Sequence, residues 1–118
     1  MIKGVVLLVE DSAVVQLDME QELLSHGASH VVIVGDVESA LEYFNSQTCE
    51  LLISEWEIEG ESCMPVLEKA KERGVSYIVA TGVDISVATD EVLNGITVLQ
   101  KPFSPLALQK ALELIAQR

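Results

Sequence analysis

The chain has 118 residues, the size of one ordinary domain with a single core. Hydrophobic residues make up 49% of it and charged residues 22%, which excludes a disordered chain. Because no apolar run approaches the ~20 residues of a membrane span and the N-terminus lacks a signal-peptide layout, we expect a cytoplasmic protein with no membrane partner. The 19 acidic and 7 basic residues give a formal charge of −12, which argues against direct nucleic-acid binding.

The cysteines and histidines indicate neither a redox motif nor a metal pair. Cys49 and Cys63 are too far apart for a C-x-x-C motif, so we expect reduced thiols. His26 and His30 are four residues apart, but Gly27 interrupts the helix that a paired-histidine metal site needs.

Apolar runs and helical patterns alternate along the chain. Continuous apolar runs, typical of strands buried on both faces, predict strands at 5–9, 31–34, 51–53, 77–80 and 96–99. The first helix is expected from Ser12 to about His26, with Val14, Leu17 and Leu24 at helical spacing. Further helices are expected at 37–47, 63–73, 87–94 and from Ser104 onward.

Five strands that alternate with five helices predict an α/β fold, in which a doubly wound parallel sheet is covered on both faces. No linker or repeat interrupts the pattern, so residues 1–118 are expected to form one domain. In such sheets, ligands bind beyond the carboxyl ends of the strands.

Polar side chains follow four of the predicted strands at that edge. They are Glu10, Asp11, Glu55, Thr81 and Lys101. A carboxylate-rich group without His or Cys suits Mg²⁺, and a lysine with a threonine suits a phosphoryl group. Each residue alone is equally consistent with a helix cap or a loop end, but five at one edge favour a site.

Three short motifs carry a resemblance to a known family. VLLVEDS at 6–12, ATG at 80–82 and KPF at 101–103, in this order and at these strand ends, resemble the signatures of response-regulator receiver domains of two-component signalling. The resemblance covers essentially the whole chain. It implies a flavodoxin-like sheet with strand order 2-1-3-4-5.

The resemblance also implies a magnesium site. Glu10 and Asp11 match the acidic pair that holds Mg²⁺ in receivers, and the expected ligand set is Glu10, Asp11, Glu55 and Glu57. We expect weak Mg²⁺ binding at these four positions.

A phosphorylation site is implied in the same way. Thr81 matches the residue that contacts the phosphoryl group, and Lys101 matches the lysine that pairs with a phosphoryl oxygen. The Lys101–Pro102 peptide is expected to be cis, as is common in receivers.

The phosphoacceptor position departs from the family, because Glu55 stands where receivers carry Asp. Gly60 supports this alignment; a slip by one residue would put Ser54 there and turn the strand's side chains to the other face. One extra methylene displaces the reactive oxygen from near-attack geometry, so we expect no stable phosphorylation. The longer carboxylate either imitates the phosphorylated state, by reaching Lys101 or Thr81, or merely fills the acidic site.

Two further departures lie nearby. Val98 replaces the aromatic residue that rotates in receivers, which puts two-state switching through this position in doubt. The acidic run 55–61, which contains Trp56, is interpreted as a solvated loop.

The leading hypothesis is a receiver domain of a phosphorelay that is not an enzyme and is poorly phosphorylated or not phosphorylated. We expect it to be standalone, since no output domain follows Arg118. Its expected partners are a histidine kinase or phosphotransfer protein, and a downstream protein or second copy on the face of the fourth helix, fifth strand and fifth helix. The alternative is a phosphorylation-independent pseudo-receiver that acts as a protein-interaction module.

Two other classes are less favoured. A small Mg²⁺-dependent phosphatase lacks a nucleophile at a recognisable elbow, and a flavin or nucleotide carrier lacks a glycine-rich phosphate loop.

Overall fold

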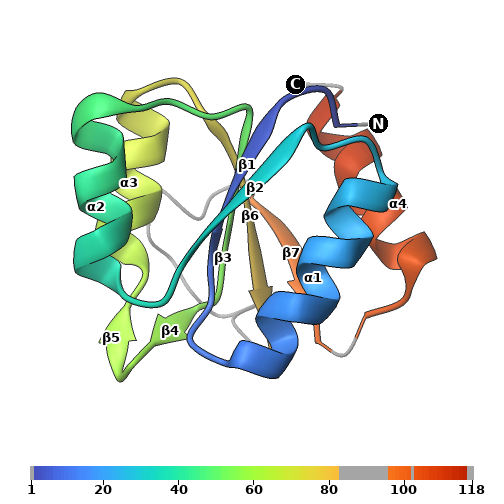
Figure 1. Cartoon of the computed structure of the whole chain (residues 1–118), viewed down its shortest axis with the longest axis horizontal. Helices are drawn as coiled ribbons and strands as arrows, with labels where there is room; N and C mark the ends of the chain where they lie inside the picture. Colours follow the sequence, from blue (N-terminus) through green and yellow to red (C-terminus); the bar gives the residue numbers. More distant parts are fainter. Residues whose placement is uncertain (1, 83–95, 102, 117–118) are drawn as a thin grey trace.

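The computed structural model describes residues 2–82, 96–101 and 103–116. Five parallel strands form one sheet in the order β2-β1-β3-β6-β7 (Figure 1). The strands are β1 (Val5–Val9), β2 (His30–Val34), β3 (Leu51–Ser54), β6 (Ser76–Thr81) and β7 (Thr97–Gln100). Counted within the sheet, this is the expected order 2-1-3-4-5, and each strand lies within one residue of its predicted bounds.

The described part of the chain contains four helices rather than the five expected. They are α1 (Ala13–Ser25), α2 (Val37–Ser46), α3 (Met64–Glu72) and α4 (Pro105–Ala116). The fifth was expected at 87–94, which lies outside the described residues, as does Pro102 with its expected cis peptide.

Side-chain caps explain where the helices begin. Asp36 accepts a hydrogen bond from the Ser39 N–H at 2.7 Å at the start of α2, and Ser104 accepts one from the Ala107 N–H at 3.1 Å at the start of α4. Helix α3 begins at Met64 and not at Cys63, which makes no side-chain cap.

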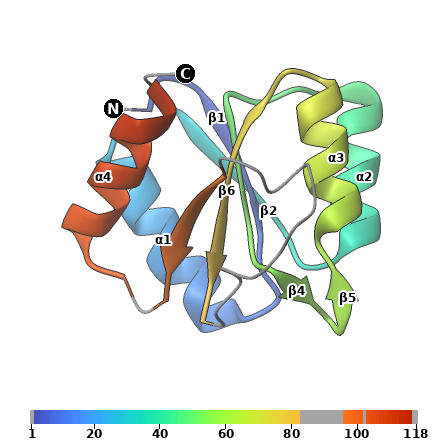
Figure 2. The ribbon, with the colours of Figure 1, turned by 180° about the vertical axis from the view of Figure 1, so that it is seen from behind.

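Helices cover both faces of the sheet, α1 and α4 on one face and α2 and α3 on the other (Figures 1 and 2). Because successive side chains of a strand point to opposite faces, β1 contributes Val6 and Leu8 to the core under α1 and α4. It contributes Leu7 and Val9 to the core under α2 and α3. Both cores are continuous, which fixes the strands in register and aligns their carboxyl ends.

Helix α1 does not bury the residues from which it was predicted. Val14, Leu17 and Leu24 are 72%, 56% and 47% exposed, whereas Met19 and Leu23 are buried against the sheet. The helical spacing was therefore interpreted correctly as a helix, but it marks the solvent face.

The acidic run after β3 is a hairpin and not only a solvated loop. Strands β4 (Glu57–Ile58) and β5 (Glu61–Ser62) pair antiparallel around Glu59 and Gly60, whose φ angles are +50° and +78°. Positive φ at both turn residues suits a tight two-residue hairpin. Ile58 is fully buried and anchors the hairpin to the core under α2 and α3.

No helix in the ranges that the structure describes combines the length and apolar character needed to cross a membrane.

Candidate functional site

The carboxyl edge of the sheet holds a lysine between two glutamates. Glu10 and Glu55 directly follow the neighbouring strands β1 and β3, and their backbone N–H groups still donate to Val34 and Val9 in the adjacent strands, at 3.0 and 2.9 Å. Lys101 directly follows β7. The ladder therefore directs these side chains to one edge, although Lys101 is far from Glu10 in sequence.

The Lys101 ammonium contacts both carboxylates. Its Nζ donates to Glu10 Oε1 at 2.7 Å and lies 3.3 Å from Glu55 Oε1. The remaining oxygens accept backbone hydrogen bonds, Glu10 Oε2 from the Ser12 N–H at 3.0 Å and Glu55 Oε2 from the Trp56 N–H at 2.8 Å. Every oxygen of the two carboxylates is thus engaged within the chain.

Burial makes this network strong. The Glu10 side chain is only 3% exposed, and those of Lys101 and Glu55 are each 18% exposed. Burial alone would disfavour the charged lysine, but hydrogen bonding and attraction from Glu10 and Glu55 outweigh it and raise the pKa of Lys101. Lys101 therefore remains an ammonium at physiological pH.

Asp11 has a different partner from that of Glu10. Its Oδ2 accepts a hydrogen bond from the Glu59 N–H at 2.8 Å, which links the end of β1 to the turn of the hairpin. That hydrogen bond is the main reason that the pKa of Asp11 is lowered. Asp11 itself is exposed.

The other predicted residues occupy separate positions. Thr81 ends β6, is buried, and accepts a hydrogen bond from the Lys101 backbone N–H through its carbonyl at 2.8 Å. Ser54 is fully buried and its hydroxyl donates to the Glu55 carbonyl, so it is not an accessible competitor for Glu55. Glu57 is exposed in β4 and makes none of the contacts above.

The expected magnesium ligands have suitable oxygen donors, but they do not form a ligand group. Among the described residues, no three His, Cys, Asp or Glu side chains are placed to hold a metal ion together. Lys101 instead supplies the positive charge between Glu10 and Glu55. The arrangement therefore does not fit a preformed divalent-cation site.

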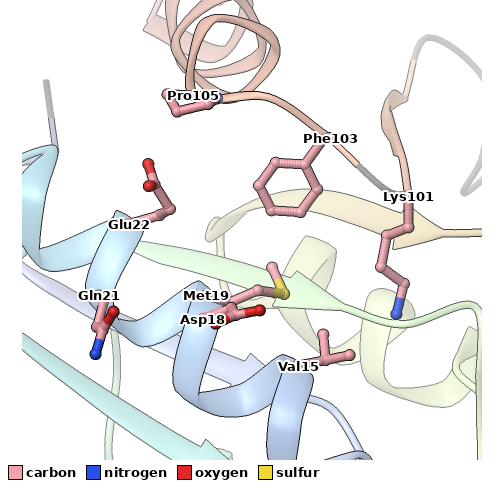
Figure 3. A pocket seen from close by; sticks show the side chains of 8 residues that line it. All are labelled: Val15, Asp18, Met19, Gln21, Glu22, Lys101, Phe103 and Pro105. Atoms are coloured by element: carbon pink, nitrogen blue, oxygen red, sulfur yellow. The ribbon is translucent and has the colours of Figure 1, made fainter.

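A hollow of about 530 Å³ lies beside Lys101, between α1 and the segment that leads into α4. Figure 3 shows Phe103 and Met19 facing each other across it, with Asp18 and Glu22 on the α1 side. Its lining thus combines apolar side chains with two carboxylates and the Lys101 ammonium.

Solved structures similar to this chain include receiver domains of two-component signalling proteins. SdrG from Sphingomonas melonis Fr1 is 27% identical with a TM-score of 0.82, over 97% of each chain. The receiver domain of sensor histidine kinase PA1611 from Pseudomonas aeruginosa PAO1, which has a magnesium ion in its active site cleft, is 23% identical with a TM-score of 0.78, over 97% of this chain and 98% of its own. TrrA from Thermotoga maritima in complex with Mg²⁺-BeF is 21% identical with a TM-score of 0.80, over 95% of this chain and 98% of its own.

No protein-family model matches the sequence, and no curated protein does. The structural neighbours establish that the chain has the receiver type of α/β fold.

Two features of the site were missed from the sequence. The hydrogen bond between Asp11 and Glu59 joins residues 48 positions apart and depends on a turn that the acidic composition concealed. The hollow beside Lys101 depends on how α1 packs, for which the only sequence signal was the mixed apolar pattern of that helix.

Proposed function

We propose that this chain is a receiver-like signalling module in which Glu55 does not become stably phosphorylated and whose output is association with other proteins. Its fold is that of receiver domains, and its partners would be proteins of a two-component pathway: a histidine kinase, a phosphotransfer protein or a downstream target. The formal charge of −12 disfavours nucleic acid as a direct partner.

The observation that carries the proposal is the contact of Lys101 with both Glu10 and Glu55. An acyl phosphate forms only when the attacking carboxylate oxygen is held in near-attack geometry with the donor phosphorus. Both Glu55 oxygens have partners already, one from Lys101 and one from the Trp56 N–H. The contact of Glu55 with Lys101 supports the proposal that the longer side chain imitates the phosphorylated state.

This proposal needs no metal ion, because the Lys101 ammonium neutralises Glu10 and Glu55 in part. It also includes no catalytic step. Burial raises the pKa of the Cys49 thiol, and raises that of the Cys63 thiol to about 12, so neither is an activated nucleophile.

Intact-mass spectrometry after incubation with acetyl phosphate and Mg²⁺ tests the proposal. Wild type and Glu55→Gln are expected to gain no phosphoryl adduct, whereas Glu55→Asp is expected to gain one, because the shorter carboxylate matches the acceptor of receivers and no longer reaches Lys101 in the same way. The Glu55→Asp adduct shows that the reagent works. An adduct on wild type that is absent from Glu55→Gln would make Glu55 a true phosphoacceptor and contradict the proposal.

A further inference from the structure

The hollow beside Lys101 has the size of a ligand site, and the proposed function does not use it. Its volume of about 530 Å³ lies within the range of ~300–1,000 Å³ that is typical of sites for small organic molecules. One wall is a single face of α1, along which the lining residues recur at spacings of three and four. The residues on this face are Val15, Asp18, Met19 and Glu22.

The two walls of the hollow present apolar surface to each other. Met19 on α1 and Phe103 in the segment before α4 face each other across it (Figure 3). Val15 and Pro105 add to this apolar lining. Such walls favour a ligand with an apolar body, because water leaves the facing surfaces when that body enters.

The two carboxylates of the hollow lack a cation. Asp18 and Glu22 lie one turn apart, and no Lys or Arg occurs in Ala13–Ser25. In the part of the chain that the structure describes, no hydrogen bond or ion pair joins Asp18 to another residue. Glu22 Oε2 lies 3.9 Å from His26 Nδ1, which is closer to the Glu22 carbonyl at 2.8 Å. Lys101 does not neutralise them, because its ammonium already contacts two other carboxylates.

Other classes of small ligand suit this lining less well. A divalent metal ion takes six or more oxygen ligands, whereas no three His, Cys, Asp or Glu side chains of the described ranges are placed to hold one. An anion would meet the carboxylates of Asp18 and Glu22. An organic ammonium ion needs only one or two carboxylates and brings its own apolar body.

We propose that the hollow between α1 and the start of α4 binds a small organic amine in its cationic form. The ammonium group lies against Asp18 and Glu22, and the apolar body lies between Met19 and Phe103. This site goes beyond the proposed function, because it does not depend on the state of Glu55.

Three soluble probes separate the contributions of charge and apolar body. The first is 2-phenylethylamine, which is an ammonium ion at pH 7 and carries both features. The second, 2-phenylethanol, keeps the ring and lacks the charge, and the third, ethylamine, keeps the charge and lacks the ring. We expect wild type to bind 2-phenylethylamine with a dissociation constant on the order of 1 mM and to bind each of the other two about tenfold more weakly.

Spectra of ¹³C-labelled methionine methyl groups report where the probe binds. Met19 lines the hollow, whereas Met64 on α3 packs against the core on the opposite face of the sheet. We expect 2-phenylethylamine to shift the Met19 methyl signal until it saturates and to leave the Met64 methyl signal unshifted.

Matched acidic variants test the role of Asp18. Asp18→Asn and Glu68→Gln each remove one negative charge from an exposed helix position, but only Asp18 lines the hollow. Both variants should keep the fold, as far-UV circular dichroism would verify. We expect Asp18→Asn to weaken binding of 2-phenylethylamine about threefold and Glu68→Gln to leave it unchanged.

Any of four results would overturn the proposal. They are no saturable shift of the Met19 methyl, equal binding of 2-phenylethanol, equal binding of ethylamine, and equal effects of Asp18→Asn and Glu68→Gln. The last two would assign the attraction to the net charge of the chain alone. Phosphorylation of Glu55 would contradict the proposed function and leave these titrations unchanged, so the two failures are distinguishable.

Discussion

The carboxyl edge of the sheet and the outward face of α1 differ in how far their side chains find partners within the chain. At the edge, Lys101 joins Glu10 and Glu55, and in the ranges that the structure describes no buried side-chain polar atom lacks a partner. On α1, Leu17 and Leu24 expose about half of their surface. Among the described residues, the polar groups of the edge thus satisfy one another within the chain, whereas Leu17 and Leu24 remain exposed to solvent.

The largest expected loss of stability distinguishes two adjacent leucines on α1. Leu23 is fully buried and Leu24 is 47% exposed. Leu23→Ala should lower the free energy of unfolding by about 3 kcal/mol, because it opens a cavity in the core, while Leu24→Ala should lower it by less than about 0.5 kcal/mol. Urea unfolding measures both. Equal losses would mean that the outward face of α1 is packed within the chain and is not a free surface.

The next largest effect is expected at the edge. Lys101→Met should lower the free energy of unfolding by about 2 kcal/mol, since it leaves the buried Glu10 carboxylate without its cation. The loss is smaller than for a fully buried pair, because Lys101 is partly exposed.

Lys69→Met is the matched control for Lys101→Met, because Lys69 pairs with Glu72 at 3.7 Å on the surface. Its effect should stay below about 0.5 kcal/mol. If the two lysine variants lost equally little stability, the edge network would not be the closed unit described above.

The smallest effect concerns Asp11 and depends on pH. Because the hydrogen bond from the Glu59 N–H lowers the pKa of Asp11 below its usual 3.8, the charged form stabilises the fold above that pH. This contribution is lost as the pH falls through the lowered pKa.

Asp11→Asn should therefore lower the urea midpoint slightly at pH 7 and not at the acid end of the series. Asp18→Asn, which leaves the contact with Glu59 intact, serves as the control. A difference between Asp11→Asn and wild type that persists unchanged in acid would assign the effect to the side-chain shape and not to the charge.

The sheet and most helices could be predicted because their signals are local. Val5–Val9 is an unbroken apolar, β-branched run that suits a strand covered on both faces. Asp36 before Val37–Ser46 is a cap whose hydrogen bond the structure contains. Alternation of such strands and helices leaves few topologies, so strand order followed from the connections and the resemblance together.

The exposed face of α1 could not be predicted, because helical spacing is the same for apolar residues that face a core and apolar residues that face solvent. Val14, Leu17 and Leu24 recur as regularly as Val37, Ala40 and Phe44 in α2, yet only the α2 set is buried. Contact with the sheet decides between the two, and that contact is set by the whole fold.

The detailed site also required the three-dimensional arrangement. Glu10 and Lys101 are 91 residues apart, and whether the ammonium bridges two carboxylates or leaves them free depends on side-chain geometry at the sheet edge. The hairpin was concealed by its acidic composition, in which buried Ile58 and the Glu59–Gly60 turn were the only signals.

The central claim is that Glu55 is held in an internal ion pair and is not a phosphoacceptor. Amide ¹H–¹⁵N spectra of wild type and Glu55→Asp, recorded before and after acetyl phosphate with Mg²⁺ present throughout, test it most directly. We predict that acetyl phosphate leaves the amides of Glu55, Trp56 and Lys101 unshifted in wild type and shifts the corresponding amides in Glu55→Asp. Shifts of these amides in wild type that Glu55→Gln abolishes would contradict the claim and identify Glu55 as an acceptor.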